Sequence, residues 1–212
     1  MFKQDKDPAI WMEAKKEGCE KMEVILKEVS IESLPEYARV PIALEVNSIY
    51  VVDEVDEGLG GLKLKEESVA PAYIKDYDAD PGEGPLSWPD KFNLENSGIF
   101  LAQAEGITRG AAAVFFHNPE IRMLEGRDDL AVLWDIRVDN NFRGLGIGRS
   151  LFHYSARWAR EKGCSLLKVE TQNINTGACQ FYKKMGCRLG IIHRYAYLDY
   201  PEEIMLVWYL EL

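Results

Sequence analysis

The sequence predicts a mixed α/β fold in which a mostly antiparallel central sheet contains one β–α–β unit. Residues 98–105 and 109–117 are two apolar, strand-like runs joined by three residues, a pattern typical of a β-hairpin. From residue 130 onward the pattern alternates strand, helix and strand, as in a β–α–β crossover. We therefore expect antiparallel pairing in the first half of the chain and a crossover in the second.

A single domain is expected behind a short N-terminal segment. Residues 1–21 are charged and are predicted to form a helical extension, and residues 22–212 are predicted to form the domain. The other elements expected in the first half are strands at 22–29 and 46–55, a short helix at 30–40 and a turn at 56–61. Those expected in the second half are strands at 130–138, 165–171, 187–198 and 204–212, with helices at 148–162 and 176–185.

Residues 66–96 form a long segment without sustained periodicity, and they carry four of the nine prolines. Long irregular segments in compact domains tend to be binding loops or lids. Tyr73, Tyr77 and Trp88 favour a segment that faces a substrate. The alternative is a connection without a binding role.

Composition argues against several partners. Lys and Arg number 25 and Asp and Glu 35, so the net charge is −10, which disfavours general binding to nucleic acid or to a membrane surface. The N-terminus has no apolar leader core and no apolar run approaches about 18 residues, so a cytoplasmic protein is expected. The four cysteines show no metal-ligand spacing, so no metal site is expected. The apolar C-terminal strand, 205–212, could help to form a homodimer.

A glycine-rich loop, RGLGIG at 143–148, follows a predicted strand and opens into a predicted helix. Glycines let the backbone approach a phosphate closely, and free N–H groups at a helix N-terminus favour an anion. A P-loop would need a lysine after the glycines, and none is present. A dinucleotide fingerprint would need glycine where Arg149 stands, although Glu170 lies near the expected ribose ligand. At this point a diphosphate site, a dinucleotide site and a simple packing turn all remain open.

A second motif, NTGACQFYKKMGC at 175–187, follows the next predicted strand. Ala178, Phe181, Tyr182 and Met185 recur at helical spacing and form one stripe, which by itself predicts packing. Gly186 is placed to end this helix.

Together, the two motifs resemble the GNAT family of N-acetyltransferases across residues 98–190. Within it, WDIRVDNNFRGLGIG and ETQNINTGACQFYKKMGC are similar to the streptothricin acetyltransferase branch. The resemblance implies acetyl-coenzyme A as cosubstrate and a primary amine of a small, cationic, streptothricin-like molecule as acceptor, with antibiotic resistance as a role. A protein lysine or N-terminal acetyltransferase and a non-catalytic acyl-coenzyme A sensor are the alternatives.

The resemblance also implies residues that hold the cosubstrate. The loop residues Arg143, Gly144, Gly146 and Gly148 would bind the pyrophosphate through backbone N–H groups. The strand from Ile136 to Val138 would pair with the pantetheine arm as an added strand would. Asn175 would orient the arm.

Three residues are the candidates for catalysis. Tyr182 is suited to protonate the departing thiolate, since a phenol has a pKa of about 10 and a thiol one of about 8.5; its alternative is a core tyrosine. Asp135 is expected to anchor the substrate ammonium and Glu170 to act as base, while a solvated acid and a strand-end cap are their alternatives. Trp134 is expected on the opposite face of its strand from Asp135, in the core.

Overall fold

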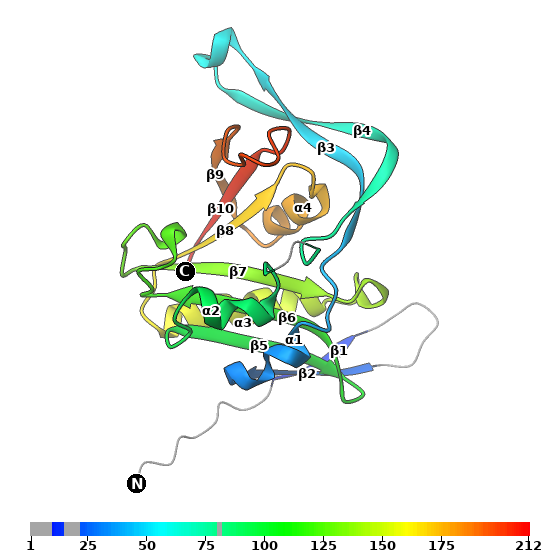
Figure 1. Cartoon of the computed structure of the whole chain (residues 1–212), viewed down its shortest axis with the longest axis vertical. Coiled ribbons are helices and arrows are strands. Elements are labelled where there is room, and N and C mark those ends of the chain that lie inside the picture. The colour runs from blue at the N-terminus through cyan, green and yellow to red at the C-terminus, as the bar shows by residue number, and fades with distance from the viewer. Residues whose placement is uncertain (1–9, 15–21, 80–81) are drawn as a thin grey trace. The chain divides into compact units, whose positions relative to one another are not determined.

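The computed structural model of the chain describes residues 10–14, 22–79 and 82–212 (Figure 1). Its contacts divide the chain into two compact units, which are described separately. The first holds the described residues up to Ile42, Tyr77–Leu167 and Leu212; the second holds Ala43–Asp76 and Lys168–Glu211. Within the described residues, short 3₁₀ helices connect the main elements at Ile31–Ser33, Asp56–Gly58, Pro85–Ser87, Arg122–Leu124 and Asn140–Phe142.

The first unit is built on antiparallel strands that run in the order β1, β2, β5, β6 and β7. The predicted hairpin is confirmed, and its turn is the pair Glu105 and Gly106, both with positive φ, as a tight two-residue hairpin turn requires. The bounds of these strands are β1 Ile10–Ala14, β2 Met22–Val29, β5 Ser97–Ala104, β6 Ile107–Phe116 and β7 Leu130–Val138.

Helices cover both faces of these strands (Figure 1). On one face lies α3 (Ile147–Glu161), which packs so closely that a Cβ on Gly110 would stand 2.8 Å from Ile147 Cγ2. Tyr37 of α1 (Leu34–Tyr37) and Trp88 of α2 (Trp88–Lys91) belong to the cluster on the other face. That cluster is completed mainly by strand residues with fully buried side chains, such as Leu101, Phe115, Leu130 and Val132. Strands β5–β7 are therefore buried on both faces and form the close-packed core of this unit.

The second unit contains the neighbouring strands β8, β10 and β9, helix α4, and a separate ribbon of β3 and β4. The ribbon contacts the residue that follows β8: the Tyr50 N–H donates to the Asn173 carbonyl at 2.9 Å, and the Asn173 side-chain amide donates to the Tyr50 carbonyl at 2.8 Å. The bounds are β3 Leu44–Glu54, β4 Leu62–Lys75, β8 Leu166–Gln172, α4 Thr176–Lys184, β9 Arg188–His193 and β10 Met205–Glu211.

Three expectations about secondary structure are wrong. Residues 10–14 of the predicted helical extension form a strand paired with β2, while 1–9 and 15–21 lie outside the described residues. Residues 66–75 of the segment expected to be irregular belong to β4, which is almost wholly exposed and so shows no hydrophobic alternation. Pro71 falls beside the register shift between β3 and β4, where a missing N–H is tolerated. The strand expected at 187–198 ends at His193.

β10 does not supply a free edge for a dimer. It lies between β8 and β9, and Leu206, Val207 and Trp208 are buried in its own unit. Burial within the fold therefore accounts for the apolar C-terminal pattern. Across the part of the chain that the structure describes, no helix is both long and apolar enough to span a membrane.

Candidate active site

The glycine loop connects β7 to α3 as the sequence predicts. Gly144 and Gly146 have φ values of +78° and +89°, a region that L-residues with a side chain seldom adopt. Gly146 is the N-cap of α3, whose first turn has neither an acidic residue nor a side-chain cap. The first N–H groups of α3 therefore have neither an acidic residue in their own turn nor a side-chain cap, an arrangement that favours an external anion.

Arg109 on β6 holds the turn that leads into this loop. Its Nη1 donates to Asp139 Oδ2 at 3.2 Å, its carbonyl accepts from the Asp139 N–H at 2.9 Å, and its guanidinium stacks 4.2 Å from the Phe142 ring centroid. Asp139 Oδ1 in turn accepts from the Asn141 N–H. The sequence shows no local signal for this contact, because Arg109 lies 30 residues before Asp139.

If the loop binds the acetyl-coenzyme A that the family resemblance implies, replacing Arg109 with Ala is expected to weaken that binding about fivefold, because the stacked ion pair fixes the entry to the loop. Isothermal titration calorimetry measures the dissociation constant. Arg157→Ala is the matched control: it also removes an ion pair and a ring contact, but on α3 away from the turn. Equal affinities in the two variants would contradict a role for Arg109 in shaping the loop.

A bulge at Trp134 changes which way the side chains of β7 point. Ala113 pairs with Asp135 and the next β6 residue, Val114, pairs with Leu133, so Trp134 is the extra residue. Its ring contacts Phe92 and Phe115, which lie on the same face of the sheet as Asp135. The expectation that Trp134 and Asp135 occupy opposite faces is therefore wrong, because a bulge interrupts the alternation that the prediction assumed.

Asp135 is fully engaged by its neighbours. Its Oδ1 accepts from the Tyr37 hydroxyl at 2.6 Å and from Arg137 Nε at 2.9 Å, and its Oδ2 accepts from Arg137 Nη2 at 2.6 Å. The side chains of Asp135 and Arg137 are 9% and 2% exposed. A carboxylate fixed in a forked pair with a buried guanidinium is poorly suited to bind a substrate ammonium or to take a proton.

The protonation states of this cluster follow from its burial. Burial raises the pKa of Tyr37 well above its ordinary value, and the charge of Asp135 raises it further, so Tyr37 is a neutral donor. Burial by itself lowers the pKa of Arg137, but the hydrogen bonds and charge of Asp135 raise it above its ordinary value. Arg137 is therefore a permanent buried cation.

The second unit holds the other predicted catalytic residues. Tyr182 lies on α4 and is 5% exposed, and Glu170 lies near the end of β8. The Tyr197 hydroxyl, from the connection between β9 and β10, donates to Glu170 Oε1 at 2.7 Å. Asn175 caps α4, since its Oδ1 accepts from the Ala178 N–H at 3.0 Å. No local sequence pattern predicts the contact of Tyr197 with Glu170, because the two residues lie 27 positions apart.

The predicted site residues thus fall into two groups. The structure brings together Asp135, Ile136, Val138, Arg143, Gly144, Gly146 and Gly148 in the first unit, and Glu170, Asn175 and Tyr182 in the second.

Comparison with known proteins identifies the family. The family model described as "Acetyltransferase (GNAT) family" matches residues 65–187, which is more than half of the chain. Streptothricin acetyltransferase A of Bacillus subtilis (strain 168) is 30% identical over 146 residues, covering 68% of this chain and 76% of the relative. The chain belongs to the GNAT acetyltransferase family.

Two further comparisons extend this result. A streptothricin acetyltransferase of Escherichia coli is 29% identical over 187 residues, covering 85% of this chain and 95% of the relative. A Bacillus anthracis structure, solved in complex with acetyl coenzyme A, superposes with a TM-score of 0.69 at 24% identity, covering 89% of this chain and 97% of the other. The latter shows the GNAT fold. As a member of this family, the chain is an acetyltransferase whose cosubstrate is acetyl-coenzyme A.

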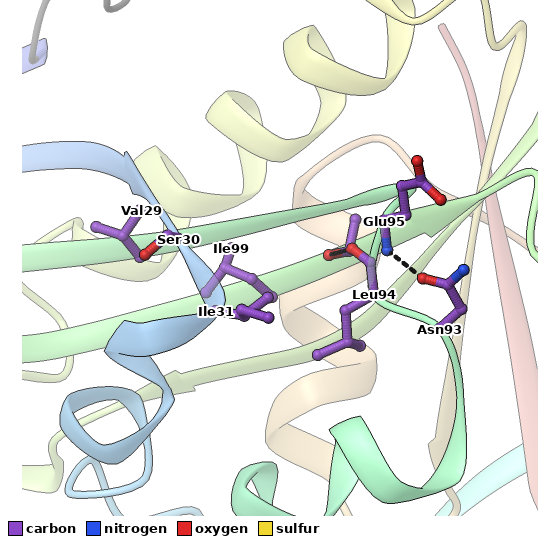
Figure 2. A pocket seen from close by; sticks show the side chains of 8 residues that line it. Val29, Ser30, Ile31, Asn93, Leu94, Glu95 and Ile99 are labelled. Atoms are coloured by element: carbon purple, nitrogen blue, oxygen red, sulfur yellow. Dashed lines mark hydrogen bonds between the residues drawn. The ribbon is translucent and has the colours of Figure 1, made fainter.

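A surface hollow of about 430 Å³ lies elsewhere on the first unit of this GNAT protein (Figure 2). Its lining comes from the end of β2, the start of β5 and the segment before β5. The pairing of β5 with β6 and of β6 with β7 places the start of β5 at the opposite end of the strands from Val138 and the glycine loop. The lining residues are Val29, Ser30, Ile31, Asn93, Leu94, Glu95, Ser97 and Ile99.

The cysteines of the described part of the chain are poor nucleophiles. Burial raises the pKa of Cys179 to about 12 and that of Cys187 to about 11, and it raises the pKa of Cys164 as well. A thiolate is the reactive form, so these side chains stay protonated at neutral pH. The raised pKa values of these three thiols therefore do not support an acetyl-cysteine intermediate on Cys164, Cys179 or Cys187.

Proposed function

We propose that this acetyltransferase moves the acetyl group of acetyl-coenzyme A directly onto a primary amine of a small, cationic, streptothricin-type molecule. The observation that carries this proposal is the similarity to a streptothricin acetyltransferase across 95% of that relative. The net charge of −10 is compatible with a cationic acceptor. A role in antibiotic resistance follows from the same proposal.

The glycine loop fits the diphosphate of the cosubstrate. At Gly144 a Cβ would meet no atom within 4 Å, so its surface is open, and the loop leads to the uncapped start of α3. In our proposal the backbone N–H groups from Arg143 to Gly148 hold the pyrophosphate, and the strand from Ile136 to Val138 pairs with the pantetheine arm. Bound acetyl-coenzyme A supplies an activated acyl group in its thioester.

Direct transfer requires two proton movements. A neutral amine attacks the thioester carbonyl, the new C–N bond forms and the C–S bond breaks, so the amine loses a proton and the thiolate gains one. We assign the first proton to Glu170, through water, and the second to the Tyr182 hydroxyl. The raised pKa values of Cys179 and Cys187 disfavour a covalent intermediate on either of these two thiols.

Two assignments differ from those the sequence suggests. Asp135 is proposed to position β7 rather than to anchor the acceptor, because Arg137 and Tyr37 occupy its oxygens. Asn175 is proposed to act on the cosubstrate only through α4, since its side chain caps that helix. Tyr197 is proposed to orient the Glu170 carboxylate.

An amine panel read by release of free thiol tests the proposal. Streptothricin, an aminoglycoside, a polyamine and a lysine peptide are each offered with acetyl-coenzyme A. We expect streptothricin to give the highest kcat/KM and mass spectrometry to show one added acetyl group per amine. If acetyl-coenzyme A stabilises the protein against heat but no amine releases thiol, the chain is an acyl-coenzyme A sensor and the proposal fails.

A further inference from the structure

One buried guanidinium joins three separate parts of the first unit. Besides its forked pair with Asp135, Arg137 donates from Nη1 to the Val40 carbonyl at 3.1 Å and to Asp78 Oδ2 at 2.6 Å. Its Nη2 also lies 3.3 Å from Asp78 Oδ1. Arg137 stands on β7, between the two residues expected to border the pantetheine arm, Ile136 and Val138.

Two of the partners of Arg137, Val40 and Asp78, flank the part of the chain that forms the β3–β4 ribbon. The chain leaves the first unit after Ile42 to form β3, and it returns from β4 at Tyr77. Val40 and Asp78 therefore stand at the two roots of the β3–β4 ribbon, within two residues of each crossing. A single side chain on the strand that borders the glycine loop thus holds both roots.

The chemistry of the guanidinium favours a rigid set of contacts, called the clasp below, in which Arg137 binds Asp135, Asp78 and the Val40 carbonyl. Arginine presents donors in a planar fork and can satisfy two carboxylates and a carbonyl at once, which the point charge of lysine cannot do. The Arg137 side chain is 2% exposed and that of Asp78 is 29% exposed, so solvent screens the pair weakly. The Asp78 carboxylate therefore fixes the course of the chain where the ribbon returns.

We propose that Arg137, through Asp78 and the Val40 carbonyl, is a positioning residue that sets acceptor binding by fixing both roots of the β3–β4 ribbon at β7. The inference rests on the proposed function, because it assigns the root segments of the first unit, 40–42 and 77–79, to recognition of the cationic amine. The same strand carries the edge proposed to bind the pantetheine arm, from Ile136 to Val138. The ion pair with Asp135 fixes the Arg137 guanidinium on β7, and the ion pair with Asp78 connects the guanidinium to the root at which the ribbon returns.

Asp78→Asn separates these two roles, because it keeps the Asp135 pair and removes only the charge at the ribbon root. We expect the KM for the acceptor amine to rise about tenfold, with kcat within about threefold and the acetyl-coenzyme A dissociation constant within about twofold of wild type. Asp90→Asn is the control, since it makes the same charge change at an exposed position on α2. Arg137→Lys keeps the charge but loses the fork, and it should raise the acceptor KM at least as much.

Amide hydrogen exchange provides a readout that does not depend on turnover. The amides of residues 40, 42, 43 and 76–79 should exchange faster in Asp78→Asn than in Asp90→Asn or wild type. Unchanged exchange at these roots, or an unchanged acceptor KM in Asp78→Asn or Arg137→Lys, would overturn the inference. A wild-type protein that acetylates no amine would refute the proposed function instead, while the exchange data would still decide whether the clasp exists.

Discussion

Replacing Tyr182 with Phe is expected to lower kcat by about two to three orders of magnitude while acetyl-coenzyme A binding stays intact. The change removes one hydroxyl from a buried side chain on α4 and leaves its ring in place. Loss of a positioned general acid typically costs about 10²–10⁴ in rate. Steady-state kinetics with free-thiol detection gives kcat, and calorimetry gives the dissociation constant of the cosubstrate.

Tyr154→Phe is the matched control for this experiment. Tyr154 is also a tyrosine on a helix with 5% exposure, but it packs against Phe100 on the sheet side of α3. Both variants should lose similar thermal stability, and only Tyr182→Phe should lose turnover. A Tyr182→Phe enzyme whose kcat stays within about threefold of wild type would identify Tyr182 as a packing residue and refute its assignment as the acid.

The second large effect is expected at Gly146, where Ala should weaken acetyl-coenzyme A binding by about tenfold. Gly146 has a φ of +89° at the N-cap of α3, and a left-handed conformation costs an L-residue about 1–2 kcal/mol. The loop either carries this strain or moves its N–H groups away from the diphosphate. Calorimetry with acetyl-coenzyme A and with free coenzyme A measures the change.

Gly163→Ala controls for backbone strain at the other end of the same helix. Gly163 also has a φ of +89° and follows the end of α3, and a Cβ there would meet no atom within 4 Å. The two variants should therefore show comparable drops in melting temperature. Equal loss of cosubstrate affinity in both would mean that strain in α3, rather than loop geometry, controls binding.

Much of the fold could be predicted because its signals are local. The strand at 130–138, the following glycine loop and helix α3 appear where the sequence places them, since helical periodicity and glycine spacing act over a few residues. β4 could not be predicted, because its pairing with β3 stabilises a strand that buries almost nothing. The bulge at Trp134 was also invisible, because it is defined only by the partner strand.

The features of the site also divide into those that depend on neighbouring residues in the chain and those that depend on long-range contacts. The sequence by itself determined the family resemblance, the glycine loop and the position of Tyr182 on a helix, because each depends on residues that are neighbours in the chain. Only the tertiary structure decided the surroundings of Asp135 and Glu170. Tyr37 reaches Asp135 across 98 residues, Asp78 reaches Arg137 across 59, and Tyr197 reaches Glu170 across 27. Contacts over such separations form only when packing of the core brings the segments together, so no local pattern encodes them.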